Sequence, residues 1–329
     1  MTVKTWSTPV KEEKKNAVPC PCCGASVFKP ALDCKDFSYV RCKSCGLVHM
    51  NPQPAREEII ARYNCTSAKD YLEYELENET AFLTLQQLAL TDAGFYNLEK
   101  SLFSHFATKF PAHLAAKLPA HLATKFPAQE LNSSGKIQPS VIDIGSATGA
   151  LISVLRDRGW NVTGVEISPG ADYARNVRKL DVQSLPLEEN NFPQECFDVV
   201  LASHLIEHLN DPRSFLAETF RILKDGGYIF ITTPNVSGFQ ARLYGGRWRS
   251  AIFDHLCLFS ARTLKRMLIN AGFKIEGICT WGGLAAGLAP AWLKKPADIL
   301  AKRFGCGDVM IVRAQKPGVL SRQNTSVIK

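Results

Sequence analysis

The run Val141-Ile142-Asp143-Ile144-Gly145-Ser146-Ala147-Thr148-Gly149-Ala150, followed by Val165-Glu166-Ile167, decides the fold of this chain. Its first apolar residues are typical of a buried strand, and Gly145 and Gly149 allow the backbone to turn tightly before a helix. The first N–H groups of that helix point toward any bound anion. Glu166 ends the second strand about twenty residues on, where an acid can accept hydrogen bonds from both hydroxyls of a ribose. The run therefore predicts an α/β sheet that binds a nucleoside-bearing cofactor.

The turn departs from the usual dinucleotide fingerprint G-x-G-x-x-G, because Ala147 stands where the second glycine is expected. Without that glycine the backbone cannot approach a bulky pyrophosphate as closely, whereas a methionine carboxylate needs less room. Taken alone, the motif also fits a purely structural turn in an α/β protein.

The chain downstream continues the alternation of strands and helices. Residues 191–209 read as a turn, a buried strand and a polar strand exit. A helix over 212–223, a turn at 224–227 and a strand over 228–232 follow, and that strand leads into Thr233-Pro234-Asn235.

Together these motifs resemble the class I S-adenosylmethionine-dependent methyltransferases. The resemblance is carried by Phe197-Asp198-Val199-Val200, Glu207-His208-Leu209, Gly226-Gly227, Thr233-Pro234-Asn235, Asp254 to Ser260 and Ala271-Gly272-Phe273, so it covers roughly residues 137 to 315. It implies a Rossmann-like, seven-stranded and mostly parallel sheet with helices on both faces. Two last strands are expected over 274–280 and 308–314, with a helix over 296–304 between them.

The resemblance also implies which residues hold S-adenosylmethionine. The methionine end is expected at Asp143, Gly145, Ser146, Ala147 and Gly149, the ribose at Glu166 and Ile167, the adenine at Glu188, and the strand exit at Ser203.

The acceptor is expected beside the strand exit that carries His204. A neutral imidazole titrates near working pH, so His204 is the first candidate for a general base, His208 the second and His255 the third. Related quinone-biosynthesis O-methyltransferases look similar here but place a Glu where His204 stands, and in them this exit has been linked to a divalent metal. His204, Glu207 and His208 could therefore offer metal ligands, although Glu207 and His208 capping and packing the next helix is the favoured alternative.

Cysteines near the N-terminus form two C-x-x-C-G knuckles, Cys20 to Gly24 and Cys42 to Gly46. Two facing knuckles place four thiolates in the tetrahedral arrangement that structural zinc prefers. Cys20, Cys23, Cys42 and Cys45 are the predicted ligands, with Cys22 and Cys34 as bystanders. Methyltransferases of this branch look similar here, including the Cys-Gly-Leu-Val segment and the Asn-Pro-x-Pro exit.

The region between ribbon and first core strand holds a helical pattern and then an eight-residue unit repeated three times, from His105, His113 and His121. A period of eight with a proline in each unit favours a tolerated surface insertion over a histidine metal site. The expected organisation is a disordered tail over 1–18, the zinc ribbon over 19–52, a helical cap or linker over 53–104, the repeat insertion over 105–135, the methyltransferase domain over 136–317 and a disordered tail over 318–329.

Composition and charge bear on the compartment of the protein and on the class of its partner. The chain has 329 residues and a net charge of +8, without an apolar stretch long enough to span a membrane or a secretory signal, which favours a cytoplasmic protein. The expected function is methyl transfer to a small molecule such as a sugar, a lipid-linked precursor or a secondary metabolite. The positive charge keeps open an RNA methyltransferase whose ribbon grips nucleic acid, although this is not favoured, and a non-catalytic cofactor-binding scaffold is the third hypothesis. The acceptor, the atom methylated and the oligomeric state are not predicted.

Overall fold

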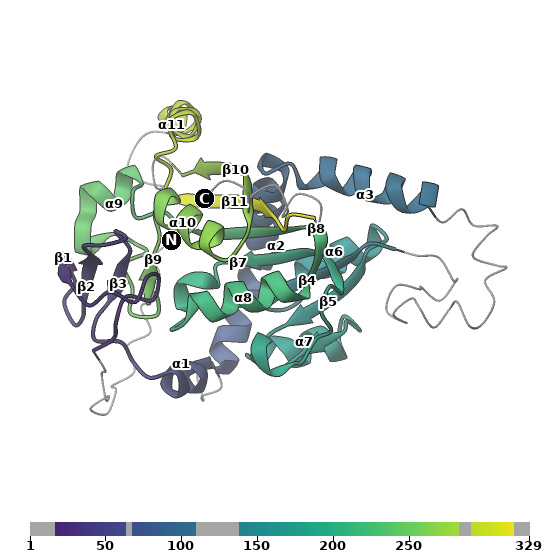
Figure 1. Ribbon diagram of the computed structural model, residues 1–329, viewed down its shortest axis with the longest axis horizontal. Coiled ribbons are helices and arrows are strands. Elements are labelled where there is room, and N and C mark those ends of the chain that lie inside the picture. Colours follow the sequence, from purple (N-terminus) through teal and green to yellow (C-terminus); the bar gives the residue numbers. More distant parts are fainter. Residues whose placement is uncertain (1–16, 64–67, 110–137, 283–290, 319–329) are drawn as a thin grey trace, which may run out of the picture.

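The computed structural model describes residues 17–63, 68–109, 138–282 and 291–318 (Figure 1). Both predicted tails, apart from residues 17–18 and 318, and nearly all of the repeat insertion lie outside these ranges. No helix in the described ranges is long and apolar enough to cross a membrane.

The centre of the fold is a seven-stranded sheet in the order β10-β11-β8-β7-β4-β5-β6. Its strands are β4 (Ser140–Ile144), β5 (Asn161–Val165), β6 (Val182–Gln183), β7 (Phe197–Ser203), β8 (Leu223–Pro234), β10 (Lys274–Trp281) and β11 (Val309–Gln315). The strands from β6 to β8 run parallel, whereas β11 pairs antiparallel with both β8 and β10. The predicted Rossmann-like, mostly parallel sheet is therefore confirmed.

Helices cover both faces of this sheet because its central strands are apolar on both sides. On one face, Ile142 and Ile144 of β4 join a core with α8 (Pro212–Ile222) and α10 (Ala261–Asn270). On the other face, Val141 packs with α6 (Ala150–Asp157) and the end of α2 (Ala68–Asp92). The small helix α7 (Gly170–Asn176) closes the sheet beyond β5 and β6.

The helical region before the first core strand contains α1 (Arg56–Tyr63), α2 and α3 (Phe95–Lys109). Phe95 at the start of α3 stacks on Trp160, with ring centroids 5.6 Å apart. Buried Glu99 accepts hydrogen bonds from the indole of Trp160 (2.9 Å) and from Arg158. These contacts make α3 part of the helical layer on the sheet.

The N-terminal module is a second sheet, in the order β1-β2-β3-β9, at one end of the molecule (Figure 1). Its strands are β1 (Phe28–Asp33), β2 (Ser38–Cys42), β3 (Val48–Met50) and β9 (Cys257–Leu258). Since β9 comes from the chain between β8 and α10, the module is joined to the methyltransferase domain by main-chain pairing of His49 with Cys257.

Two elements differ from their predicted bounds. The turn at 224–227 lies inside β8, where it bulges out: Phe197 pairs with Leu223, but Val199 pairs with Tyr228. The predicted helix over 296–304 is α11 (Ala291–Phe304), with Pro296 inside it rather than at its start.

Candidate active site

The glycine turn joins β4 to α6 in a left-handed backbone conformation. Gly145 and Gly149 have φ angles of 79° and 77°, and Ala147 has a φ of 48°. An alanine therefore adopts the conformation in which a glycine is usual, at a cost of about 1 kcal/mol. Gly149 begins α6 without a side-chain cap, so the first N–H groups of that helix face the turn.

The acid predicted to hold a ribose lies against this turn. The N–H of Ala147 donates to Glu166 Oε2 (2.8 Å), and the N–H of Ser168 donates to Oε1 (2.8 Å). Both oxygens are thereby fixed in direction, and each keeps a lone pair that can accept from a ligand hydroxyl. The turn itself is held by N–H groups of Gly145 and Ser146 that donate to the carbonyl of Val165.

Two buried polar atoms beneath the turn make no hydrogen bond with the described residues. Asp143 is 1% exposed, and neither its Oδ1 nor the hydroxyl of Ser146 has a hydrogen-bond partner in the described part of the chain. Burial, with the nearby charge of Glu166, raises the pKa of Asp143 to about 8. A buried carboxyl of this kind suits a cofactor that brings a donor or a cation, as the ammonium of S-adenosylmethionine does.

The other predicted cofactor residues lie at the edges of this site. Ile167 follows Glu166 and is half-buried, and Ser203 ends β7, where it pairs with Thr232. Glu188 lies on a 3₁₀ turn over Leu187–Glu189, and its Oε2 is 3.8 Å from a guanidinium nitrogen of Arg56 in α1. Its contact with adenine stays a prediction.

The cap helix α2 contacts the turn directly. Glu79 accepts a hydrogen bond from the hydroxyl of Thr148 (2.6 Å) and two from Arg178 (both 2.6 Å). This carboxylate ties α2 to the cofactor turn and to the end of α7.

At the strand exit predicted to face the acceptor, His204 is held by a chain of hydrogen bonds. Its Nδ1 lies 3.1 Å from Glu207 Oε1, and the hydroxyl of Thr233 donates to Glu207 Oε2 (2.9 Å). His204 has a φ of 52°, an uncommon conformation for a non-glycine residue that clusters at functional sites. The next residue, Leu205, packs against Gly145, so the histidine and the cofactor turn are neighbours. Thr233 was quoted in the sequence only as part of a motif, and the contact shows its role.

Two further imidazoles surround the same carboxylate. The rings of His208 and His255 meet edge to face with centroids 4.7 Å apart, and one ligating atom each of Glu207, His208 and His255 lies within 4.8 Å of the others. His255 donates from Nδ1 to the carbonyl of Ser250 (2.8 Å), which leaves its Nε2 facing the cluster as an acceptor.

The surroundings of the cluster lower the pKa values of both Glu207 and His255. Burial alone would raise the pKa of Glu207, but the hydrogen bond with His204 and the neighbouring imidazoles lower it to about 2. Burial and the adjacent His208 lower the pKa of His255 to about 3. The cluster at neutral pH therefore contains a carboxylate beside a neutral His255.

The favoured alternative for Glu207 and His208 is that they cap and pack the next helix, and its capping part is wrong. Asp211 is the N-cap of α8 and accepts from the N–H groups of Arg213 and Ser214. Glu207 points instead at His204 and Thr233, because the 3₁₀ turn over Ile206–His208 directs it back toward β8.

The cysteine cluster has the predicted membership. Cys20 Sγ lies 3.4 Å from Cys45 Sγ, Cys23 Sγ lies 3.6 Å from Cys42 Sγ, and all four sulfurs lie within 4.8 Å of one another. The sulfurs of a tetrahedral zinc site are about 3.8 Å apart, given bonds of about 2.3 Å, so these four cysteines could bind a structural zinc. Cys22 and Cys34 lie outside the cluster.

The ribbon also contacts the segment that carries His255. The hydroxyl of buried Tyr39 on β2 lies 2.8 Å from the carbonyls of both Ile252 and His255, and the N–H of Met50 donates to Leu256 (2.9 Å). The segment that carries His255 is thus held by the ribbon.

The sheet order, the glycine turn and the clamped acid define the class of proteins as S-adenosylmethionine-dependent methyltransferases with a class I fold. A family model described as a methyltransferase domain matches residues 104–277, more than half of the chain, and the chain belongs to this family.

Similar proteins carry related names. A "Ubiquinone biosynthesis O-methyltransferase" of Nitrosomonas europaea is 31% identical over 112 residues, which are 31% of this chain and 46% of that protein. A "Probable S-adenosylmethionine-dependent methyltransferase" of Mycolicibacterium smegmatis is 29% identical over 150 residues, 44% of this chain and 57% of that protein. The chain thus spans about half the length of these curated relatives. Among solved structures, a SAM-dependent methyltransferase of Thermotoga maritima has a TM-score of 0.43 and 23% identity, covering 67% of this chain and 98% of that one.

Proposed function

We propose that this methyltransferase acts on a small-molecule acceptor, such as a sugar, a lipid-linked precursor or a secondary metabolite, and that His204 is its general base. The observation that carries the proposal is the chain Thr233–Glu207–His204 beside the cofactor turn. The relatives named for ubiquinone biosynthesis support a small acceptor, since their names state O-methylation in that pathway.

The cofactor, when bound, supplies a methyl group on a sulfonium sulfur, which becomes a thioether as the methyl group leaves. We expect Asp143 and the turn to hold its methionine end and Glu166 its ribose. With Nδ1 turned to Glu207, His204 presents Nε2 to the acceptor and takes its proton there. Glu207 keeps its negative charge at neutral pH and so stabilises the imidazolium that forms. Proton removal by a positioned general base contributes typically about 10²- to 10⁴-fold in rate.

The ribbon in this proposal is a structural zinc module that also shapes the acceptor side. Zinc would hold Cys20, Cys23, Cys42 and Cys45, and with them β2 and β3, which carry Tyr39 and Met50. A ribbon of this size has too small a core to fold without its metal. We therefore expect zinc loss to release the segment at Ile252 to Leu256.

The decisive variant is His204→Asn. Asparagine tolerates the left-handed conformation at this position, and its amide can still donate to Glu207, but it lacks a group equivalent to Nε2. The expected result is unchanged S-adenosylmethionine affinity in calorimetry and a 10²- to 10⁴-fold loss of labelled-methyl transfer to a metabolite extract. His105→Asn, at an exposed position on α3, is the matched control.

Other outcomes separate the rivals. Cofactor binding without transfer to any acceptor would support a non-catalytic scaffold, and salt-sensitive transfer to RNA would support a nucleic-acid substrate. Transfer that requires added Mg²⁺ while the ribbon keeps its zinc would instead assign Glu207, His208 and His255 to a divalent cation. Full activity in His204→Asn would overturn the base assignment.

A further inference from the structure

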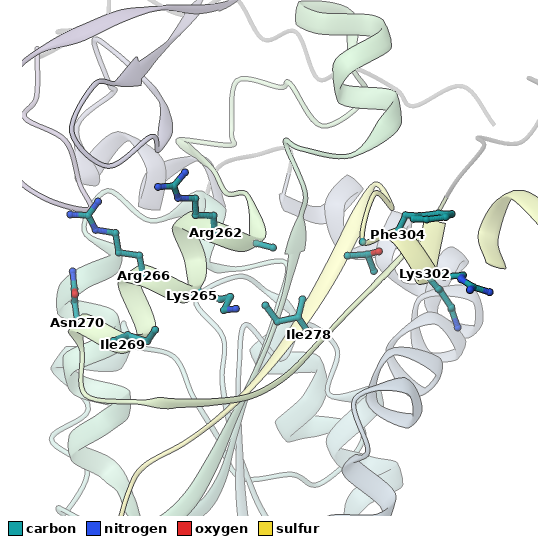
Figure 2. A pocket seen from close by; sticks show the side chains of 12 residues that line it. Arg262, Lys265, Arg266, Ile269, Asn270, Ile278, Lys302 and Phe304 are labelled. Carbon is teal, nitrogen blue, oxygen red and sulfur yellow. The ribbon is translucent and has the colours of Figure 1, made fainter. Parts of the chain in front are cut away.

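A basic groove lies between α10, β10 and the end of α11 (Figure 2). Its volume is about 730 Å³, and Figure 2 shows Ile278 of β10 between the cations of α10 and those of α11. We call it the α10–α11 groove. The residues that line it are Ala261, Arg262, Lys265, Arg266, Ile269, Asn270, Ile278, Thr280, Lys302, Arg303, Phe304 and Gly305.

The lining carries five cations and no carboxylate. Two of the cations are engaged: Lys302 pairs with Asp92 (2.6 Å), and Arg266 donates to the carbonyl of Ser44 (3.3 Å). Arg262, Lys265 and Arg303 are exposed and have no hydrogen bond or ion pair with the described residues. Clustered positive charge of this kind is complementary to a surface with several phosphates.

Large apolar side chains lie exposed on the same two helices. Ile299, Leu300 and Phe304 of α11 are 65%, 53% and 71% exposed, and Ile269 of α10 is 55% exposed. The opposite face of α11 is anchored, because Ala301 is buried and its carbonyl accepts a hydrogen bond from Thr280 (2.9 Å). α11 therefore turns outward a face that mixes apolar and basic side chains, the composition of helices that lie in a membrane interface.

We propose that the α10–α11 groove docks this protein on a surface of anionic phospholipid. Arg262, Lys265 and Arg303 would bind headgroup phosphates, while Leu300 and Phe304 enter the boundary of the acyl chains. A single-stranded nucleic acid is the less favoured occupant, because base stacking needs aromatic platforms and Phe304 is the only aromatic residue in the lining.

The groove also lies toward the catalytic edge of the sheet. β10 is antiparallel to β11 and β11 to β8, so β10 ends at the same edge as β8. Beyond α11, Asp308 accepts hydrogen bonds from Trp248 (2.5 Å) and Arg249 (2.6 Å), in the stretch that leads to His255. Docking would thus bring the acceptor side toward the lipid surface. The docking itself does not depend on which acceptor is methylated.

The test is flotation of the full chain with vesicles of phosphatidylcholine, alone or mixed with phosphatidylglycerol. We expect binding to the mixed vesicles alone, weakened by salt. The triple variant Arg262→Ser, Lys265→Ser and Arg303→Ser should bind the mixed vesicles about 100-fold more weakly, given about 1 kcal/mol for each basic residue near an anionic surface. Phe304→Ser should bind roughly tenfold more weakly through the loss of apolar burial.

The matched control removes three exposed cations elsewhere, as Lys29→Ser, Lys100→Ser and Arg213→Ser, and so leaves the same net charge. Coincident thermal melting curves in far-ultraviolet circular dichroism verify that both triple variants are folded. Equal binding to neutral and mixed vesicles, or equal binding by the two triple variants, would overturn the proposal. So would tight binding to a single-stranded RNA oligonucleotide, lost in the groove variant, without binding to either vesicle.

Discussion

The buried imidazole of His255 should make the stability of this protein depend on pH between neutrality and about pH 5. Its side chain is 8% exposed, and burial together with His208 lowers its pKa to about 3. In the unfolded chain the same imidazole has its ordinary pKa near 6.5. As the pH falls below about 6.5, His255 becomes protonated in the unfolded state but stays neutral in the folded state. Stability is therefore lost on acidification through this window.

The magnitude follows from the two pKa values. At about pH 5 the solution is about 1.5 pH units below the unfolded pKa and still well above the folded one. Each unit contributes about 1.4 kcal/mol, so His255 should lower the free energy of unfolding by about 2 kcal/mol at about pH 5 relative to about pH 8.

The perturbation is His255→Asn, whose amide can still donate to the carbonyl of Ser250. Urea unfolding of wild type and variant at about pH 8, 6.5 and 5 gives the difference between their free energies of unfolding at each pH. We expect the stability advantage of the wild type to shrink by about 2 kcal/mol from about pH 8 to about pH 5. Because zinc loss would release the segment that carries His255, the comparison is restricted to the pH values at which both proteins retain their zinc.

His105→Asn, at an exposed position, should show no such trend. The reasoning would be refuted if the difference between wild type and His255→Asn stayed constant across the pH range, because His255 would then not be held neutral by its burial.

Three further predictions concern the cofactor turn and helix α8. Glu166→Gln leaves one N–H of the turn without its acceptor and removes a charged partner for the ribose, so S-adenosylmethionine should bind at least about tenfold more weakly in calorimetry, and unchanged affinity would contradict the ribose role. Gly149 has a positive φ, and the Cβ added by Gly149→Ala would lie 2.7 Å from Leu180 Cδ1. This variant should therefore lower the free energy of unfolding in urea by about 1–3 kcal/mol, and an unchanged value would disprove the steric strain. Asp211→Ala removes the N-cap of α8 and should cost about 1 kcal/mol by the same measurement, whereas an exposed Asp181→Ala should cost little.

Much of the fold could be predicted from the sequence because its signals are local. The apolar run before Gly145, the glycines of the turn and the acid at Glu166 lie within one strand–helix–strand unit, and their spacing predicts that unit whether or not the turn binds a ligand. The cysteine knuckles are local in the same sense, since each places two sulfurs on one tight turn. The bounds of α11 were missed because Pro296 was expected to start the helix, whereas it lies inside it.

The histidine cluster around Glu207 depends on contacts between residues far apart in the chain. The sequence placed His204 and Glu207 near each other, but their partner Thr233 comes from the next strand, and His255 arrives beside His208 from beyond β8. Glu79 likewise reaches the cofactor turn from a helix 69 positions upstream of Thr148.

By itself the sequence determined the α/β class, the family resemblance and the four cysteines, because each follows from residue spacing within a short segment. Only the tertiary structure decided that Glu207 serves His204 rather than the cap of α8, and that the ribbon holds the segment of His255 through Tyr39, 216 positions away. Such contacts depend on how β9 pairs with β3 and on how the helices pack, and no local pattern of residues encodes those distances.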